Sequence, residues 1–319
     1  MESSQEKPIT TSKMVLRPHQ REAIDEIEAS IAFGSQKLIL EAATAFGKSF
    51  VLSTLAENLT GRVMIIVTFT PLIEQIADHL DEVGSDYSIL KAGMEDRFDP
   101  TKRIQLVMAQ TLHARNDKLD MKADYLLKDE VHVEWLGQKR MDSIYKSLGE
   151  PTIIGVSGTP YSAKGYKLVG SDDLIRTKSI KELTDAGFLT PVKYYVPKWA
   201  EDVNYDDISI KGNDYTESDI DSIVLQSEYM EPAIQSMMAM KIDKKKSIVF
   251  CNGIEHCDLV TANLKAKGVS AISYHSKMDK ELDKWTLEWY KGDYDISFED
   301  FMKAIHQAEE VIKAKGRLC

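Results

Sequence analysis

The first half of the chain alternates short apolar runs with amphipathic stretches. The apolar runs are residues 38–40, 63–67, 104–108, 125–127 and 153–156. Between them, apolar residues recur every three or four positions, as Leu52, Leu55 and Leu59 do, which is typical of a helix with one buried face. Strands that alternate with helices predict a parallel sheet covered on both faces. We therefore predict an α/β fold, in which ligands bind at the carboxyl ends of the strands.

The same pattern predicts helix boundaries and a second lobe. Pro18 opens a predicted helix, and Thr70 and Pro71 suit the N-cap and the first position of another. The alternation stops after Pro160 and resumes further along the chain. The later elements are predicted strands at 248–250 and 269–274 and predicted helices at 259–266 and 282–290. The two α/β halves therefore predict a pair of similar lobes.

A phosphate-binding loop is predicted soon after the first apolar run. Its residues are Thr44-Ala45-Phe46-Gly47-Lys48-Ser49. In such a loop, backbone N–H groups and a helix N-terminus face the phosphates of a nucleotide. Lys48 would neutralise the phosphates and Ser49 would ligate Mg²⁺, so ATP and Mg²⁺ are the expected cofactors. The alternative is a chance Gly-Lys-Ser, because Ala42 stands where the strict pattern has its first glycine.

An acidic box follows the fourth apolar run. Its residues are Asp129-Glu130-Val131-His132. We expect Asp129 to hold Mg²⁺ and Glu130 to orient and deprotonate the attacking water. We expect His132 to couple this site to a neighbouring lobe. A charged surface turn is the alternative, and Lys128 is unexpected because a buried aliphatic residue should precede the aspartate.

Other polar residues lie at predicted strand ends or before the first strand. Ser157 and Thr159 are expected to share the coupling role, with a plain turn as the alternative. Arg17 and Gln20 precede the phosphate loop at an interval that suits contact with the adenine of ATP. Hydroxyl groups and helix N-termini also suit contact with a nucleic-acid backbone, although helix capping explains Thr70 nearly as well. The expected nucleic-acid contacts are Thr70, Pro71, Gln110 and Thr111.

Composition narrows the class of protein. The chain has 319 residues, 43% of them hydrophobic, and a formal net charge of -11. This acidic balance argues against a surface coated with positive charge, although a local basic groove remains compatible with it. The three cysteines form no Cys-x-x-Cys pair, so we expect no zinc cluster, and their number suits a reducing compartment. Residues 1–13 are polar and no apolar run is long enough for a bilayer, so we expect a cytoplasmic protein with no membrane partner.

Five motifs, taken in chain order, resemble those of superfamily 2 helicases of the DEAD/DEAH type. They are Leu16-Arg17-Pro18-His19-Gln20, Ala45-Phe46-Gly47-Lys48-Ser49, Thr68-Phe69-Thr70-Pro71, Asp129-Glu130-Val131-His132 and Ser157-Gly158-Thr159-Pro160. Residues 179–183, 187–191 and 215–219 resemble RadD-like DNA-repair helicases and the motor subunits of type III restriction enzymes more closely. The resemblance implies two RecA-like lobes with ATP between them. It further implies ATP hydrolysis coupled to unwinding or remodelling of DNA in a bacterium or phage-infected cell, with RNA as an open alternative.

The resemblance also predicts a division of the chain. The predicted parts are a flexible tail (1–13), a first RecA-like lobe (14–186), a partial second lobe (187–296) and a helical tail (297–319). The glycine-aspartate and arginine-finger motifs of such helicases do not follow residue 296. We therefore expect a truncated helicase that is weakly active alone, unless its tail completes the lobe or a separate polypeptide supplies the motifs. A non-hydrolysing nucleic-acid-binding or interaction protein is the alternative function, and the acidic box disfavours a P-loop kinase.

Overall fold

The computed structural model describes residues 15–115, 121–132, 138–160, 171–198, 209–211, 214–242, 246–278 and 280–292. The chain divides into two compact units, residues 1–192 and residues 193–319. The segments predicted as tails, 1–13 and 297–319, lie outside the described residues. Every helix within the described ranges is too short or too polar to cross a lipid bilayer.

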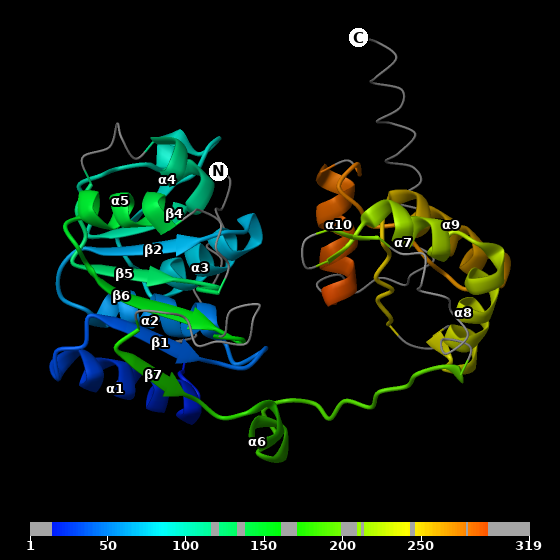
Figure 1. The fold of residues 1–319 in the computed structure, drawn as a ribbon, viewed down its shortest axis with the longest axis horizontal. Coiled ribbons are helices and arrows are strands. Elements are labelled where there is room, and N and C mark those ends of the chain that lie inside the picture. The colour runs from blue at the N-terminus through cyan, green and yellow to red at the C-terminus, as the bar shows by residue number, and fades with distance from the viewer. Residues whose placement is uncertain are drawn as a thin grey trace, which may run out of the picture. The chain divides into compact units, whose positions relative to one another are not determined.

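The first unit is built on a seven-stranded sheet with the strand order β3-β4-β2-β5-β6-β1-β7 (Figure 1). The strands are β1 (Lys37–Glu41), β2 (Val63–Val67), β3 (Tyr87–Leu90), β4 (Ile104–Met108), β5 (Tyr125–Lys128), β6 (Thr152–Ser157) and β7 (Asp173–Arg176). All six neighbouring pairs are parallel. The five apolar runs all lie in strands, so the predicted α/β fold with a parallel sheet is confirmed.

Helices cover both faces of this sheet. The helices are α1 (Pro18–Ala32), α2 (Lys48–Asn58), α3 (Thr70–Glu82), α4 (Ala109–Arg115) and α5 (Gln138–Leu148). Buried side chains of α1, α2 and α3 pack in one cluster with Ile65 of β2. Buried side chains of α4 and α5 pack in the other cluster with the next residue, Ile66. The alternation of side chains along a strand therefore divides the core into two layers.

The start of α3 differs from the prediction by one position. The helix begins at Thr70, and Phe69 is its N-cap residue, with no side-chain hydrogen bond from the cap. The prediction of Thr70 as the N-cap and Pro71 as the first helical residue is therefore wrong. Proline is tolerated throughout the first turn because the N–H groups there have no partner within the helix. Pro71 thus indicated the first turn but not the exact residue at which the helix begins.

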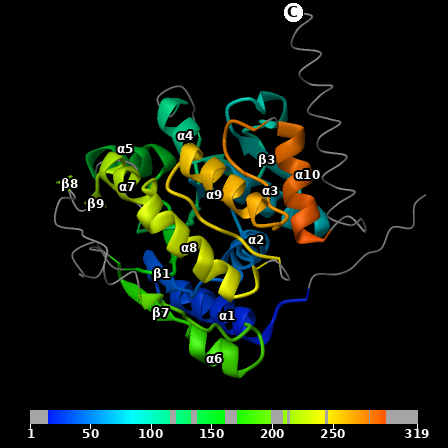
Figure 2. The same cartoon turned by 90° about the vertical axis from the view of Figure 1, so that its right-hand side faces the viewer.

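The described part of the second unit consists mainly of helices (Figure 2). They are α7 (Glu217–Val224), α8 (Ser227–Ala239), α9 (Ile254–Ala266) and α10 (Lys280–Lys291), and a short hairpin joins β8 (Ile210–Lys211) to β9 (Asp214–Tyr215). Helices α9 and α10 confirm the two predicted later helices. Buried side chains of α8 and α9 pack together in a small cluster that contains Ile234, Val260 and Leu264.

The two strands predicted in the second unit do not form. Neither residues 248–250 nor residues 269–274 pair with a neighbouring strand among the described residues. Val249 packs against the helical core, whereas Ile248 and Phe250 are 60% and 91% exposed. The alternation of a strand is therefore present, but no hydrogen-bonded neighbour is found among the described residues. Apolar alternation predicts which side chains face the core, and a ladder requires a partner strand as well.

Candidate nucleotide-binding site

The order of the strands brings three of the predicted motifs together. Strands β5, β6 and β1 are consecutive neighbours in the sheet. The acidic box follows β5, Ser157 ends β6 and the phosphate loop follows β1. Because parallel strands end at the same edge, these motifs meet at the carboxyl edge of the sheet, where α/β proteins bind ligands.

The phosphate loop has the backbone that such a loop needs. Ala45 and Gly47 have positive φ angles of 63° and 93°, and Gly47 is the N-cap of α2. This conformation turns the chain sharply between β1 and the helix. The Phe46 side chain is fully buried in the core. The Phe46 side chain therefore anchors the loop to the core and does not occupy the space in front of the N-terminus of α2.

Lys48 is held by the acidic box. Its Nζ lies 3.1 Å from Glu130 Oε1, and the two side chains are 17% and 26% exposed. A Cβ added to Gly158 would lie 3.8 Å from the same Nζ, so the turn after β6 also approaches it. The residues predicted to bind phosphate and to activate water are thus in direct contact.

The predicted coupling residues continue this chain of contacts. His132 Nδ1 lies 2.7 Å from Ser157 Oγ and 3.4 Å from Glu130 Oε2. The Thr159 N–H donates to Ser157 Oγ at 3.0 Å. The polar groups from Lys48 to Thr159 therefore form one connected network across the ends of three strands.

Ser49 and Asp129 are the candidate ligands for Mg²⁺. Ser49 is the second residue of α2, and the two residues are 6% and 2% exposed. Burial raises the pKa of Asp129, and the charge of Glu130 raises it further. A nucleotide-bound Mg²⁺ keeps waters and phosphate oxygens and takes only one or two protein ligands. The donors fit this ion, although the described residues contain no group of three acidic, His or Cys side chains that could hold a metal ion by themselves.

The two residues predicted to meet adenine lie beside the phosphate loop. Gln20 is 6% exposed, and its Nε2 donates to the Phe46 carbonyl oxygen at 2.9 Å. Its Oε1 accepts from the Arg17 N–H at 2.9 Å. The Arg17 side chain is exposed, with its guanidinium 5.7 Å from the Phe188 ring centre. Gln20 therefore holds the loop directly, a role that the motif alone did not predict.

The predicted nucleic-acid residues occupy the other half of the same edge. They follow β2 and β4, which neighbour each other beyond β5. Thr70, Pro71 and Gln110 are exposed, and Gln110 Nε2 donates to the Thr68 carbonyl oxygen at 3.1 Å. Thr111 is buried instead, and its Oγ1 accepts from the Ala92 N–H at 3.2 Å. Its hydroxyl therefore holds the segment after β3.

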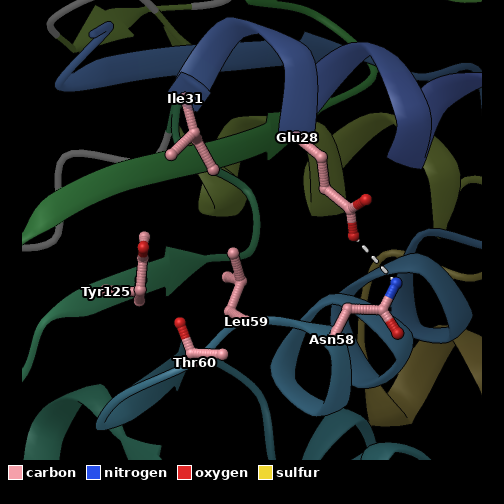
Figure 3. Close-up of a pocket in the computed structure, with 6 residues that line it drawn as sticks. All are labelled: Glu28, Ile31, Asn58, Leu59, Thr60 and Tyr125. Carbon is pink, nitrogen blue, oxygen red and sulfur yellow. Dashed lines mark hydrogen bonds between the residues drawn. The ribbon is translucent and has the colours of Figure 1, made fainter. Parts of the chain in front are cut away.

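A separate hollow lies away from these motifs (Figure 3). It is lined by Glu28, Ile31, Asn58, Leu59, Thr60 and Tyr125. Asn58 Nδ2 donates to Glu28 Oε1 at 2.8 Å across it. Tyr125 is the first residue of β5, and Leu59 and Thr60 precede β2. The hollow is therefore at the amino edge of the sheet, opposite the phosphate loop.

Part of the chain is similar to known proteins. Residues 13–162 match the family described as type III restriction enzyme, res subunit. The chain is 23% identical over 292 residues to a Saccharomyces cerevisiae protein described as "Putative ATP-dependent helicase IRC3", covering 86% of this chain and 42% of that protein. The chain thus spans less than half the length of this curated relative.

Solved structures also resemble the chain. The type ISP restriction-modification enzyme LlaBIII bound to DNA has a TM-score of 0.54 and 14% identity, covering 86% of this chain and 23% of that chain. The type ISP enzyme LlaGI, in complex with a DNA substrate mimic, has a TM-score of 0.43 and 11% identity over 93% of this chain and 33% of that chain. The family and the curated relative confirm the predicted resemblance, and LlaBIII supports the fold.

Proposed function

We propose that this relative of superfamily 2 helicases and type III restriction subunits hydrolyses ATP with Mg²⁺ and couples hydrolysis to movement along DNA or its remodelling. The observation that carries the proposal is the contact of Lys48 with Glu130 at 3.1 Å. A lysine on a phosphate loop and a carboxylate from a second strand end are the two groups that ATP hydrolysis requires at one place. His132 and Ser157 extend this contact as a network.

Each residue of the network has a proposed role. Lys48 exchanges its ion pair with Glu130 for the charge of the terminal phosphates. Glu130, once released, orients a water and accepts its proton, as a carboxylate does in general base catalysis. Ser49 and Asp129 hold Mg²⁺, which neutralises phosphate charge when bound. His132, Ser157 and Thr159 relay the position of Glu130 to residues beyond the site.

The other half of the edge is the proposed nucleic-acid surface. Thr70 and Gln110 are exposed beside the N-terminus of α3, where backbone N–H groups favour phosphate oxygens. These contacts recognise the backbone and not the bases, so RNA remains an alternative to DNA. A role in DNA repair, the division of the chain at residues 13, 186 and 296, and a partner that supplies further motifs remain hypotheses from the resemblance. The cytoplasmic location remains a hypothesis from the polar N-terminus and the lack of a long apolar run.

Calorimetry of nucleotide binding tests the site. Lys48→Ala should abolish Mg²⁺-dependent ATP binding because it removes the phosphate contact, whereas Glu130→Gln should leave binding intact. Lys102→Ala is the matched control, since Lys102 pairs with Asp86 at 2.7 Å on the surface, away from the motifs. Equal ATP binding by wild type and Lys48→Ala would overturn the assignment of the loop.

Phosphate release with and without DNA separates the two candidate functions. An ATPase should release phosphate faster with DNA, and Glu130→Gln should lose this release while still binding ATP. A non-hydrolysing binding protein would bind DNA but release phosphate only at the background rate, and Glu130→Gln would not change that rate. Such a result would leave the binding site standing and reject the proposed hydrolysis.

A further inference from the structure

An aromatic bridge joins the phosphate loop to the segment that follows α6 (Ile180–Asp185). The His19 ring lies edge-on to Phe46, with ring centres 4.9 Å apart, and edge-on to Phe188, with centres 4.6 Å apart. Phe46 is fully buried and His19 is 2% exposed. All three rings belong to the first unit. They form a continuous packed path from the loop to residue 188.

His19 contributes to this bridge through packing. Neither ring nitrogen of His19 has a hydrogen-bond partner among the described residues. Burial lowers the pKa of His19 more than the nearby Phe46 backbone raises it, so the ring is neutral near neutral pH. Edge-to-face contacts between aromatic rings are favourable in this geometry. Arg17 adds a cation–π contact to Phe188, with 5.7 Å from its guanidinium carbon to the ring centre.

The Phe188 end of the bridge is firmly anchored. Ser179 and Glu182 cap α6 reciprocally, and Leu183 of that helix is fully buried in the core. Lys178 Nζ lies 2.6 Å from Glu22 Oε2 and so ties the start of α6 to α1. The Phe188 N–H donates to the Leu183 carbonyl oxygen at 2.9 Å. The position of the Phe188 ring therefore follows from the packing of α6.

The loop end of the bridge is strained and needs support. Phe46 stands between Ala45 and Gly47, whose φ angles are 63° and 93°. A left-handed conformation is unfavourable for alanine, and such backbone persists only where the surroundings hold it. Gln20 holds the Phe46 carbonyl oxygen, and His19 contacts its ring.

We propose that Phe188 is a positioning residue for the phosphate loop, acting through His19 and Phe46. Through this bridge, the packing of the segment after α6 sets how readily the loop adopts its nucleotide-binding backbone. By linkage, nucleotide bound at the loop must in turn stabilise the packing of Phe188. The effect on nucleotide affinity rests on the proposed function, whereas the effect on the loop backbone does not.

Hydrogen exchange and ADP titration of the full chain test the bridge. In Phe188→Ala, the amides of residues 44–48 should exchange about tenfold faster, and ADP should bind about tenfold more weakly. The amides of β2 should be unchanged, which a general loss of stability would not allow. Phe188→Tyr keeps the ring and should restore both values. Phe33→Ala is the matched control, since Phe33 is 92% exposed.

The outcomes show whether Phe188 acts on the loop through the aromatic bridge or only through general packing. Exchange at residues 44–48 that is equal in Phe188→Ala and Phe33→Ala would overturn the proposal. If Phe188→Ala does not fold, Phe188→Leu and Phe188→Tyr replace it, and equal loop exchange in these two would overturn the proposal as well. If the wild type binds no ADP, the proposed function fails, and the exchange comparison still decides the role of Phe188.

Discussion

A single methyl group at Gly47 should reveal how tightly the phosphate loop is held. The φ of Gly47 is +93°, and a Cβ there would lie 2.3 Å from Gln20 Nε2. Gly34 has a similar φ of +99°, but a Cβ there would meet nothing within 4 Å. Gly47→Ala and Gly34→Ala therefore share the backbone strain, but only the Cβ at Gly47 would clash with a neighbouring side chain, that of Gln20.

The size of the difference follows from the structure. A left-handed backbone costs an L-residue roughly 1–2 kcal/mol, which is the expected loss of unfolding free energy for Gly34→Ala. Gly47→Ala must also displace the Gln20 amide and break its 2.9 Å hydrogen bond to the Phe46 carbonyl oxygen. A buried hydrogen bond contributes about 1 kcal/mol. We therefore expect a loss of roughly 2–3 kcal/mol for Gly47→Ala.

Urea unfolding followed by circular dichroism measures both losses. ADP titration should show weaker binding by Gly47→Ala only, because the displaced Gln20 no longer holds the loop. In the Gln20→Ala background the contact is absent, so Gly47→Ala should there cost no more than Gly34→Ala. Equal losses for the two single glycine variants would refute the idea that Gln20 clamps the loop.

Two buried titratable groups predict how the unfolding free energy depends on pH. The native pKa of His19 is lowered, chiefly by burial, so the unfolding free energy should fall as pH drops below about 6.5, and His19→Phe should remove this slope in urea titrations. The native pKa of Asp129 is raised, chiefly by burial, so ionised Asp129 lowers the unfolding free energy at neutral pH, and Asp129→Asn should raise that free energy. This gain should shrink as the pH approaches about 4, and thermal melts that show no gain would contradict the assignment.

Much of the first unit could be predicted from its sequence. Each strand buried on both faces appears as an unbroken apolar run, which is easily recognised. The contact of Lys48 with Glu130 agrees with a general rule, because parallel strands end at one edge and only β6 separates β1 from β5 there. Two strands, Tyr87–Leu90 and Asp173–Arg176, were not predicted, because each contains an apolar run of only two residues, against at least three in the predicted strands.

The supports of the site could not be predicted in the same way. Nothing in the local sequence shows that the Phe46 side chain faces the core, or that His19 lies between Phe46 and Phe188. These contacts join residues far apart in the chain, so the helix and strand periodicities of the sequence do not reveal them. A similar limit applies to Phe250, whose apolar neighbours predicted a strand that needs a partner to form.

The strand order places the proposed nucleotide site and the proposed nucleic-acid surface next to each other on one edge of the sheet. The acidic box follows β5, Ser157 ends β6, and the phosphate loop follows β1. Thr70 and Gln110 follow β2 and β4. Strand β2 pairs with β5 from Val63 to Ile66, so it is linked directly to the strand that precedes the acidic box. The Asp129 N–H donates to the Ile66 carbonyl oxygen at 3.1 Å, which extends this contact past the last strand residue. The proposed coupling between the acidic box and the proposed nucleic-acid residues can therefore run through the adjacent strands β5 and β2.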